Sequence, residues 1–148
     1  MEKFSDQVWA WWMQDEFKKI LSLCELCTGL SFLASSANDQ SATIPYCPAC
    51  EVWIEKILPV NDFLNEIREP SYIQLRLSLE LIFHRCNSLS HDAFHCGDWN
   101  IFSNTEWEPV RAAARQALDL IGWSEFKDEK ERFELDCRQK LYPHLYKT

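Results

Sequence analysis

The sequence predicts an all-α protein with one hydrophobic core, and its composition and the spacing of its apolar residues lead to that expectation. Glycine is scarce, with three residues among 148, against an average usage of about 7%. Hydrophobic residues make up 47% of the chain and aromatic residues 14%. Apolar positions recur mostly at helical spacing, and runs of β-branched residues are few. We therefore expect a single domain over residues 1–148, an irregular bundle of about five to six helices.

The expected helices begin at capping residues or prolines and end at proline or glycine. In chain order they cover residues 8–27, 51–58, 63–67, 71–85, 110–121 and 124–141. Pro59 is expected to end the second of them, and Gly122 the fifth. Residues 34–46 are small and polar and predict a loop. Residues 87–104 are rich in Ser, His and Asp and predict an irregular segment, and the tail 142–148 is expected to be loose.

Residues 72–83 fit either a helix or a strand. Apolar and polar residues alternate from Ile73 to Leu81, which is the period of a strand. Leu, Arg and Glu nevertheless favour a helix, and Ser71 followed by Gln74 resembles a capping box. We expect a helix here.

The acidic balance of the chain excludes some classes of function. The chain has fifteen Lys and Arg residues and 23 Asp and Glu residues, which gives a net charge of −8. Nucleic-acid binding is not expected, because phosphate recognition needs a basic surface. An acidic surface suits solubility or a protein partner with a basic surface. Phosphate-binding loops are excluded because they need clustered glycines.

The cysteine usage predicts a reducing compartment. The chain has seven cysteines, an odd number that fits poorly with a complete disulfide framework. Its first residues lack the pattern of a signal peptide, and no apolar stretch is long enough to cross a bilayer. We therefore expect a cytoplasmic protein without a membrane segment.

Two Cys-x-x-Cys pairs predict a structural zinc site. Cys24, Cys27, Cys47 and Cys50 follow the spacing C-x2-C-x19-C-x2-C, which suits four thiolates around one tetrahedral zinc ion. Two other interpretations remain open. Cys24 and Cys27 fit small core residues on an apolar helix face, and Cys47-Pro48-Ala49-Cys50 fits a redox turn at a helix N-terminus.

A second cluster of histidine and cysteine follows about 35 residues later. Cys86, His91, His95 and Cys96 have the ligand types of a second metal site, at irregular spacing. His91-Asp92-Ala93-Phe94-His95 resembles the H-E-x-x-H signature of zinc proteases, with Asp92 in place of the glutamate. Together with His84, this cluster supports an alternative in which His91, Asp92 and His95 are catalytic residues of a metal-dependent hydrolase.

Three tryptophans near the N-terminus indicate a partner surface. Trp9, Trp11 and Trp12 cannot all face one core from a single helix, and tryptophan is enriched at binding hot spots. The favoured function is therefore a non-enzymatic, zinc-stabilised module that binds another protein as an adaptor, accessory subunit or inhibitor. The alternatives are the metal-dependent hydrolase and a Cys-x-x-Cys thiol oxidoreductase. The pattern does not fix the oligomeric state.

Overall fold

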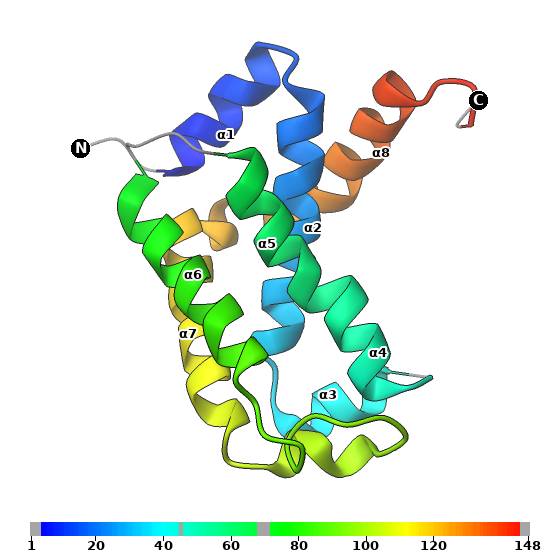
Figure 1. The fold of residues 1–148 in the computed structure, drawn as a ribbon. Helices are drawn as coiled ribbons and strands as arrows, with labels where there is room; N and C mark the ends of the chain where they lie inside the picture. The colour runs from blue at the N-terminus through cyan, green and yellow to red at the C-terminus, as the bar shows by residue number, and fades with distance from the viewer. Residues whose placement is uncertain (1–3, 45, 68–71, 146–148) are drawn as a thin grey trace.

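The computed structural model describes residues 4–44, 46–67 and 72–145, and these residues are helical without any strand (Figure 1). The α-helices are α1 (Phe4–Met13), α2 (Phe17–Ala34), α3 (Ala37–Thr43), α4 (Pro48–Val52), α5 (Leu58–Glu66), α6 (Ile73–Asn87), α7 (Trp107–Ile121) and α8 (Lys130–Leu141). The all-α prediction is confirmed for this part of the chain. Among its helices, none has the length and apolar content that crossing a membrane requires.

Helix α2 runs through the middle of the bundle, where it contacts α5, α7 and α8 (Figure 1). Most of its residues are buried, because it is surrounded on several sides. Gly29 permits a close approach of α2 to another segment. A Cβ atom at Gly29 would lie 2.5 Å from the carbonyl oxygen of Lys56. The absence of a side chain therefore sets how closely these two segments pack.

The chain from Pro48 to Glu66 is one continuous helical path, so the prediction that Pro59 ends a helix is wrong. A π-helical segment, Trp53–Ile57, joins α4 to α5. The Leu58 N–H bonds to the carbonyl oxygen of Trp53, five residues earlier. Proline in a regular α-helix clashes with the carbonyl four residues earlier and lacks an N–H donor. The wider π turn just before Pro59 accommodates both properties.

The predicted loop 34–46 contains the short helix α3. The Ser36 hydroxyl accepts a hydrogen bond from the Asp39 N–H at 3.2 Å, which is an N-cap. Small polar residues predict a loop, but a capping serine followed three residues later by an acidic residue is a helix-start signal. The segment turns the chain from the end of α2 toward Cys47.

The ambiguous segment 72–83 is helical, within α6. Its apolar residues lie on two faces of the helix, which explains the strand-like alternation. Leu75, Leu79, Ile82 and Cys86 face the core, whereas Ile73, Leu77 and Leu81 are exposed. Pro70, the expected end of one helix, and Ser71, the expected cap of the next, lie outside the described residues.

The last third of the chain follows the prediction more closely. Helix α7 begins three residues earlier than expected and ends at Ile121, and the next residue, Gly122, has a φ of 79°, the left-handed conformation that glycine favours at helix ends. The expected helix 124–141 is shorter, because the turns Trp123–Glu125 and Lys127–Glu129 are 3-10. A third 3-10 helix, Trp99–Ser103, lies within the irregular segment 87–104. Of the tail, residues 142–145 are described and are exposed.

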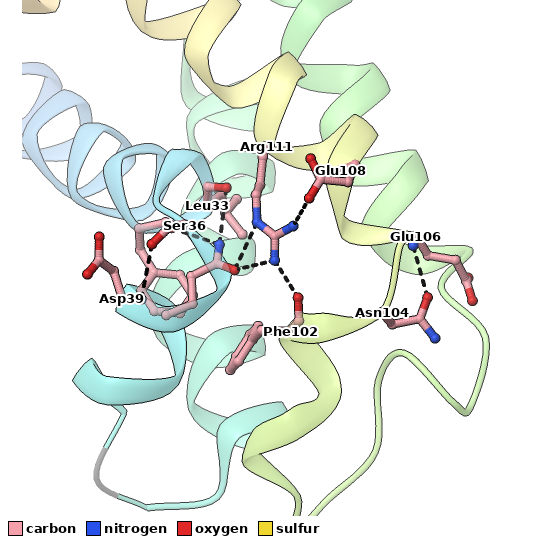
Figure 2. Close-up of polar contacts among 10 residues, drawn as sticks. Leu33, Ser36, Asp39, Phe102, Asn104, Glu106, Glu108 and Arg111 are labelled. Carbon is pink, nitrogen blue, oxygen red and sulfur yellow. Dashed lines mark hydrogen bonds and ion pairs between the residues drawn. The ribbon is translucent and has the colours of Figure 1, made fainter.

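A buried polar network joins α2, α3 and α7 (Figure 2). The Gln40 amide group donates to the carbonyl oxygens of Phe32 and Leu33, near the end of α2, at 3.0 and 3.2 Å. Its oxygen accepts from Nε and Nη2 of Arg111 at 3.2 and 3.0 Å. Arg111 also donates to the Phe102 carbonyl oxygen and pairs with Glu108. This network gives the Leu33 carbonyl group a donor near a helix end, where carbonyl groups lack intrahelical partners, and gives the Phe32 carbonyl group a second donor beside the Ser35 N–H.

Replacing Arg111 by methionine is expected to lower the free energy of unfolding by about 2–4 kcal/mol, since it leaves the buried Gln40 and Phe102 oxygens without donors. Urea unfolding measures the change as a lower midpoint with an unchanged slope. Arg115→Met, at an exposed position of the same helix, is the control and should change the stability by less than about 0.5 kcal/mol. Equal stability of the two variants would contradict a structural role for the network.

Candidate metal centre

Three cysteine thiols from distant parts of the chain converge at one end of the bundle. The sulfur atoms of Cys47, Cys50 and Cys96 lie within 4.8 Å of one another, and they form the one group of this kind in the described ranges 4–44, 46–67 and 72–145. The Sγ atoms of Cys50 and Cys96 are 3.5 Å apart. Three sulfur ligands at these distances could hold one metal ion.

The first two thiols come from the start of α4. Cys47 is the residue before the helix, and Pro48 occupies its first turn, where the missing N–H of proline costs nothing. Cys50 follows within the same turn, so the two-residue spacer brings both thiols to the same helix end. This local arrangement is the one that the Cys-x-x-Cys pattern predicts.

Long-range hydrogen bonds bring Cys96 to these two thiols. The Trp99 indole N–H donates to the Ile44 carbonyl oxygen at 2.7 Å, and the Ser41 hydroxyl donates to the Trp99 carbonyl oxygen at 2.9 Å. Earlier in the same segment, the Ala93 carbonyl oxygen accepts a hydrogen bond from the Trp107 indole N–H at 2.9 Å. These bonds fix the irregular segment 88–103 against α3 and α7. Cys96 is thereby held beside the start of α4 without a regular element of its own.

Cys47 and Cys50 have pKa values that are shifted in opposite directions. Hydrogen bonding from the backbone N–H groups of Cys50 and Gly97 lowers the pKa of Cys47 to about 7. The neighbouring sulfur atoms of Cys96 and Cys47 raise the pKa of Cys50 to about 11. Gly97 has a φ of 79°, a conformation that glycine adopts without strain. The site is therefore suited to a thiolate, which is the form of cysteine that binds metals.

The four-cysteine site predicted from the sequence is not confirmed, and Cys96 takes the place given to Cys24 and Cys27. Both residues lie within α2 and are almost completely buried. The charged neighbours of the Cys24 thiol belong to α8, not to α4, and burial raises its pKa to about 12. Burial also raises the pKa of Cys27 well above its ordinary value. Both thiols therefore fit the alternative of small core residues.

The second predicted set, Cys86, His91, His95 and Cys96, is not brought together as a metal site among the described residues. Cys86 is buried on the inner face of α6, and burial raises its pKa to about 12. The His95 ring bonds the His91 carbonyl oxygen through Nδ1 at 2.6 Å and Asp98 through Nε2 at 3.1 Å. Both of its nitrogens are thus engaged within the loop.

The catalytic alternative finds little support in the same geometry. His91 and Asp92 are exposed in a turn rather than on the helix that the signature requires. The rings of His91 and His95 stack with centroids 5.0 Å apart. His84 is exposed near the end of α6. The described donor atoms of these residues do not form a group with the spacing of a metal site.

The three tryptophans near the N-terminus lie on different faces of α1, as the helical period requires. Trp11 is buried against the core, with 1% of its surface exposed, while Trp9 is 41% exposed. Trp12 is half-buried and packs on Phe133 of α8, with ring centroids 4.9 Å apart. Trp9 also contacts Phe133, at 5.5 Å. Trp9 and Trp12, but not Trp11, are therefore accessible at the surface between α1 and α8.

Comparisons of this chain with protein-family models, with curated proteins and with solved structures find no match.

Thiol reactivity should divide the seven cysteines into two groups. In the metal-free folded protein, we expect Cys47, Cys50 and Cys96 to react with an alkylating reagent because they are accessible, and Cys47 to react faster than Cys50 because its pKa is lower. Cys24, Cys27, Cys86 and Cys137 are buried and should react only after unfolding. Mass spectrometry of peptides after timed alkylation measures each site. Fast labelling of Cys24 or Cys27 in the folded protein would contradict the arrangement.

Proposed function

We propose that this chain is a zinc-stabilised helical module that works by binding another protein. The single observation that carries the zinc part is the convergence of three thiols from two distant segments. Thiolates are preferred ligands of zinc, and such sites commonly have a structural role. The ion would join the start of α4 to the irregular segment around Cys96, which has no helix of its own to hold it.

A structural role suits this ligand set better than hydrolysis does. Three thiolates around a divalent ion give a net charge of −1 and donate strongly to the metal. Such an ion polarises a bound water less than one held by neutral imidazoles. Zinc prefers four ligands, so a water molecule or a further side chain would complete the site.

The proposed interaction role is based on the exposed apolar side chains and on the net charge of the protein. Large apolar side chains are exposed on α1 and α6, including Trp9 at 41% and Leu77 at 57%. The chain also carries a net charge of −8, which favours a partner with a basic surface. Exposed tryptophan and clustered apolar residues are typical of protein interfaces.

Native mass spectrometry with elemental analysis tests the zinc part and separates it from hydrolysis. We expect one zinc ion per chain in the purified protein, and the same content in the variant His91→Ala. A hydrolytic centre built on the histidines would lose its metal in that variant. Full zinc content in Cys47→Ser would contradict the proposal, because it would mean that the thiol cluster does not hold the ion.

A thiol–disulfide oxidoreductase is the second candidate, and one observation favours it. Cys47 has a pKa of about 7 at a helix start, with the sulfur atoms of Cys50 and Cys96 in reach. The Cys47 thiolate would attack a substrate disulfide and displace one substrate thiolate. Cys50 or Cys96 would then attack the mixed disulfide, release the second substrate thiol and leave an intramolecular disulfide. Reduction of insulin disulfides by the reduced, zinc-free protein, lost in Cys47→Ser, would support this candidate.

A further inference from the structure

A groove lies at the end of the bundle opposite the thiol cluster. It opens between the turn that joins α1 to α2 and the last turns of α8, which Figure 1 shows far from the start of α4. Its volume is about 370 Å³. Its lining residues are Trp12, Asp15, Phe17, Asp136, Gln139 and Lys140. The size is within the range of small-ligand sites, which is roughly 300–1,000 Å³.

Two aromatic rings form the apolar part of the groove. Trp12 meets Phe17 edge to face, with ring centroids 6.0 Å apart. It also packs on Phe133, with centroids 4.9 Å apart. Because Trp12 is held by both neighbours and is only half-buried, its indole ring presents a fixed surface to the groove. Aromatic faces of this kind attract cations.

The charges of the groove also favour a cation. No ion pair of Asp15 or Asp136 is present within the described residues, although both carboxylates line the groove. Lys140 is the single basic residue of the lining, so the groove keeps a net charge of −1. Helices α1 and α8 both end here, and α1 has no basic residue in its last turn, whereas α8 has Arg138 and Lys140 there. The carbonyl groups at these two helix ends add partial negative charge, and the start of α2 at Phe17 adds the partial positive charge of one helix end.

We propose that this groove binds an arginine side chain of a partner protein. A planar guanidinium group can stack on the Trp12 ring while its N–H groups reach the carboxylates of Asp15 and Asp136. A lysine ammonium group offers neither the flat face nor the forked donors. The Gln139 amide oxygen is a further acceptor in the lining.

This inference rests on the proposed interaction role and gives it a partner chemistry, but it does not depend on the metal. The probe is a blocked triarginine peptide, titrated into the full chain and followed by amide and indole NMR shifts. Trilysine and triglutamate peptides are the comparisons. Zinc content is measured on the same samples, so that loss of the metal and loss of peptide binding are seen separately. We expect triarginine to shift the Trp12 indole and Gln139 signals and to bind more tightly than trilysine.

Charge variants test whether the affinity of the groove for triarginine can be both lowered and raised. The double variant Asp15→Asn/Asp136→Asn should weaken triarginine binding about three- to tenfold, as expected for two exposed charge pairs. Lys140→Glu should strengthen it, which damage to the fold would not do. Asp119→Asn, an exposed residue of α7 outside the lining, should leave it unchanged. Any of three results would overturn the proposal. Triarginine and trilysine could bind with equal affinity, the NMR signals that shift could belong to residues outside the groove, or the double variant could bind triarginine as the wild-type protein does.

Discussion

Removal of the proposed zinc ion is expected to lower the free energy of unfolding by about 3–4 kcal/mol, measured against protein in free zinc buffered at 100 to 1,000 times the dissociation constant. This range follows from the preference of a ligand for the folded state alone, which contributes about 2.7 kcal/mol at 100-fold excess and about 4.1 kcal/mol at 1,000-fold excess. The folded chain gathers Cys47, Cys50 and Cys96, whereas the unfolded chain separates them by up to 49 positions in the sequence. Urea unfolding in zinc buffer and in chelator measures the difference.

Two variants serve as controls for that measurement. In Cys96→Ser, the stability should be low and almost independent of zinc, because one of the three ligands is absent. In Cys24→Ser, the stability should be lower because the core is altered, but the zinc-dependent increase should remain. Equal stability of the wild-type protein with zinc and with chelator would contradict a structural metal. The core would then hold the fold without it.

The second large effect is expected from Gly29→Ala. In an unconstrained helix this change stabilises by about 1 kcal/mol. Here the new Cβ would lie 2.5 Å from the Lys56 carbonyl oxygen, and the three nearest atoms all belong to the Lys56 backbone, which cannot rotate away as a flexible side chain would. We expect a net loss of about 1–3 kcal/mol in the free energy of unfolding, as overpacked cores show. Thermal and urea unfolding both measure it.

Ser31→Ala is the matched control for Gly29→Ala. Ser31 lies two residues later on the same helix and is only half-buried. Its replacement should change the stability by a few tenths of a kcal/mol, in the stabilising direction given by helix propensity. If Gly29→Ala behaves in the same way, the close packing of α2 on the π-helical segment does not constrain this position.

Local signals predicted much of the fold. Gly122 and the alanine-rich run before it indicated where α7 ends, and the structure has that end at Ile121. The local signals failed where packing elsewhere in the fold determines whether a helix begins, ends or continues. Pro59 usually ends a helix, but α2 packs along this segment and the chain continues through a π turn instead. Ser36 starts a helix within a segment whose composition is that of a loop.

The candidate site was predictable only where its geometry is local. Cys47 and Cys50 lie in one helical turn, so their spacing was sufficient. Cys96 lies 46 positions further on, and its place depends on bonds such as that from Trp99 to Ile44. The sequence did mark Cys96, followed by glycine in an irregular segment, as a metal ligand, but in a different set. Cys24 and Cys27 had the right spacing for zinc, yet the apolar helix around them indicated burial equally well.

The zinc content of single cysteine variants tests the central claim most directly. Native mass spectrometry with elemental analysis should give one zinc ion per chain for the wild-type protein and for Cys24→Ser, and a strongly reduced content for Cys96→Ser. The opposite result, with zinc lost in Cys24→Ser and retained in Cys96→Ser, would contradict a metal centre formed by Cys47, Cys50 and Cys96.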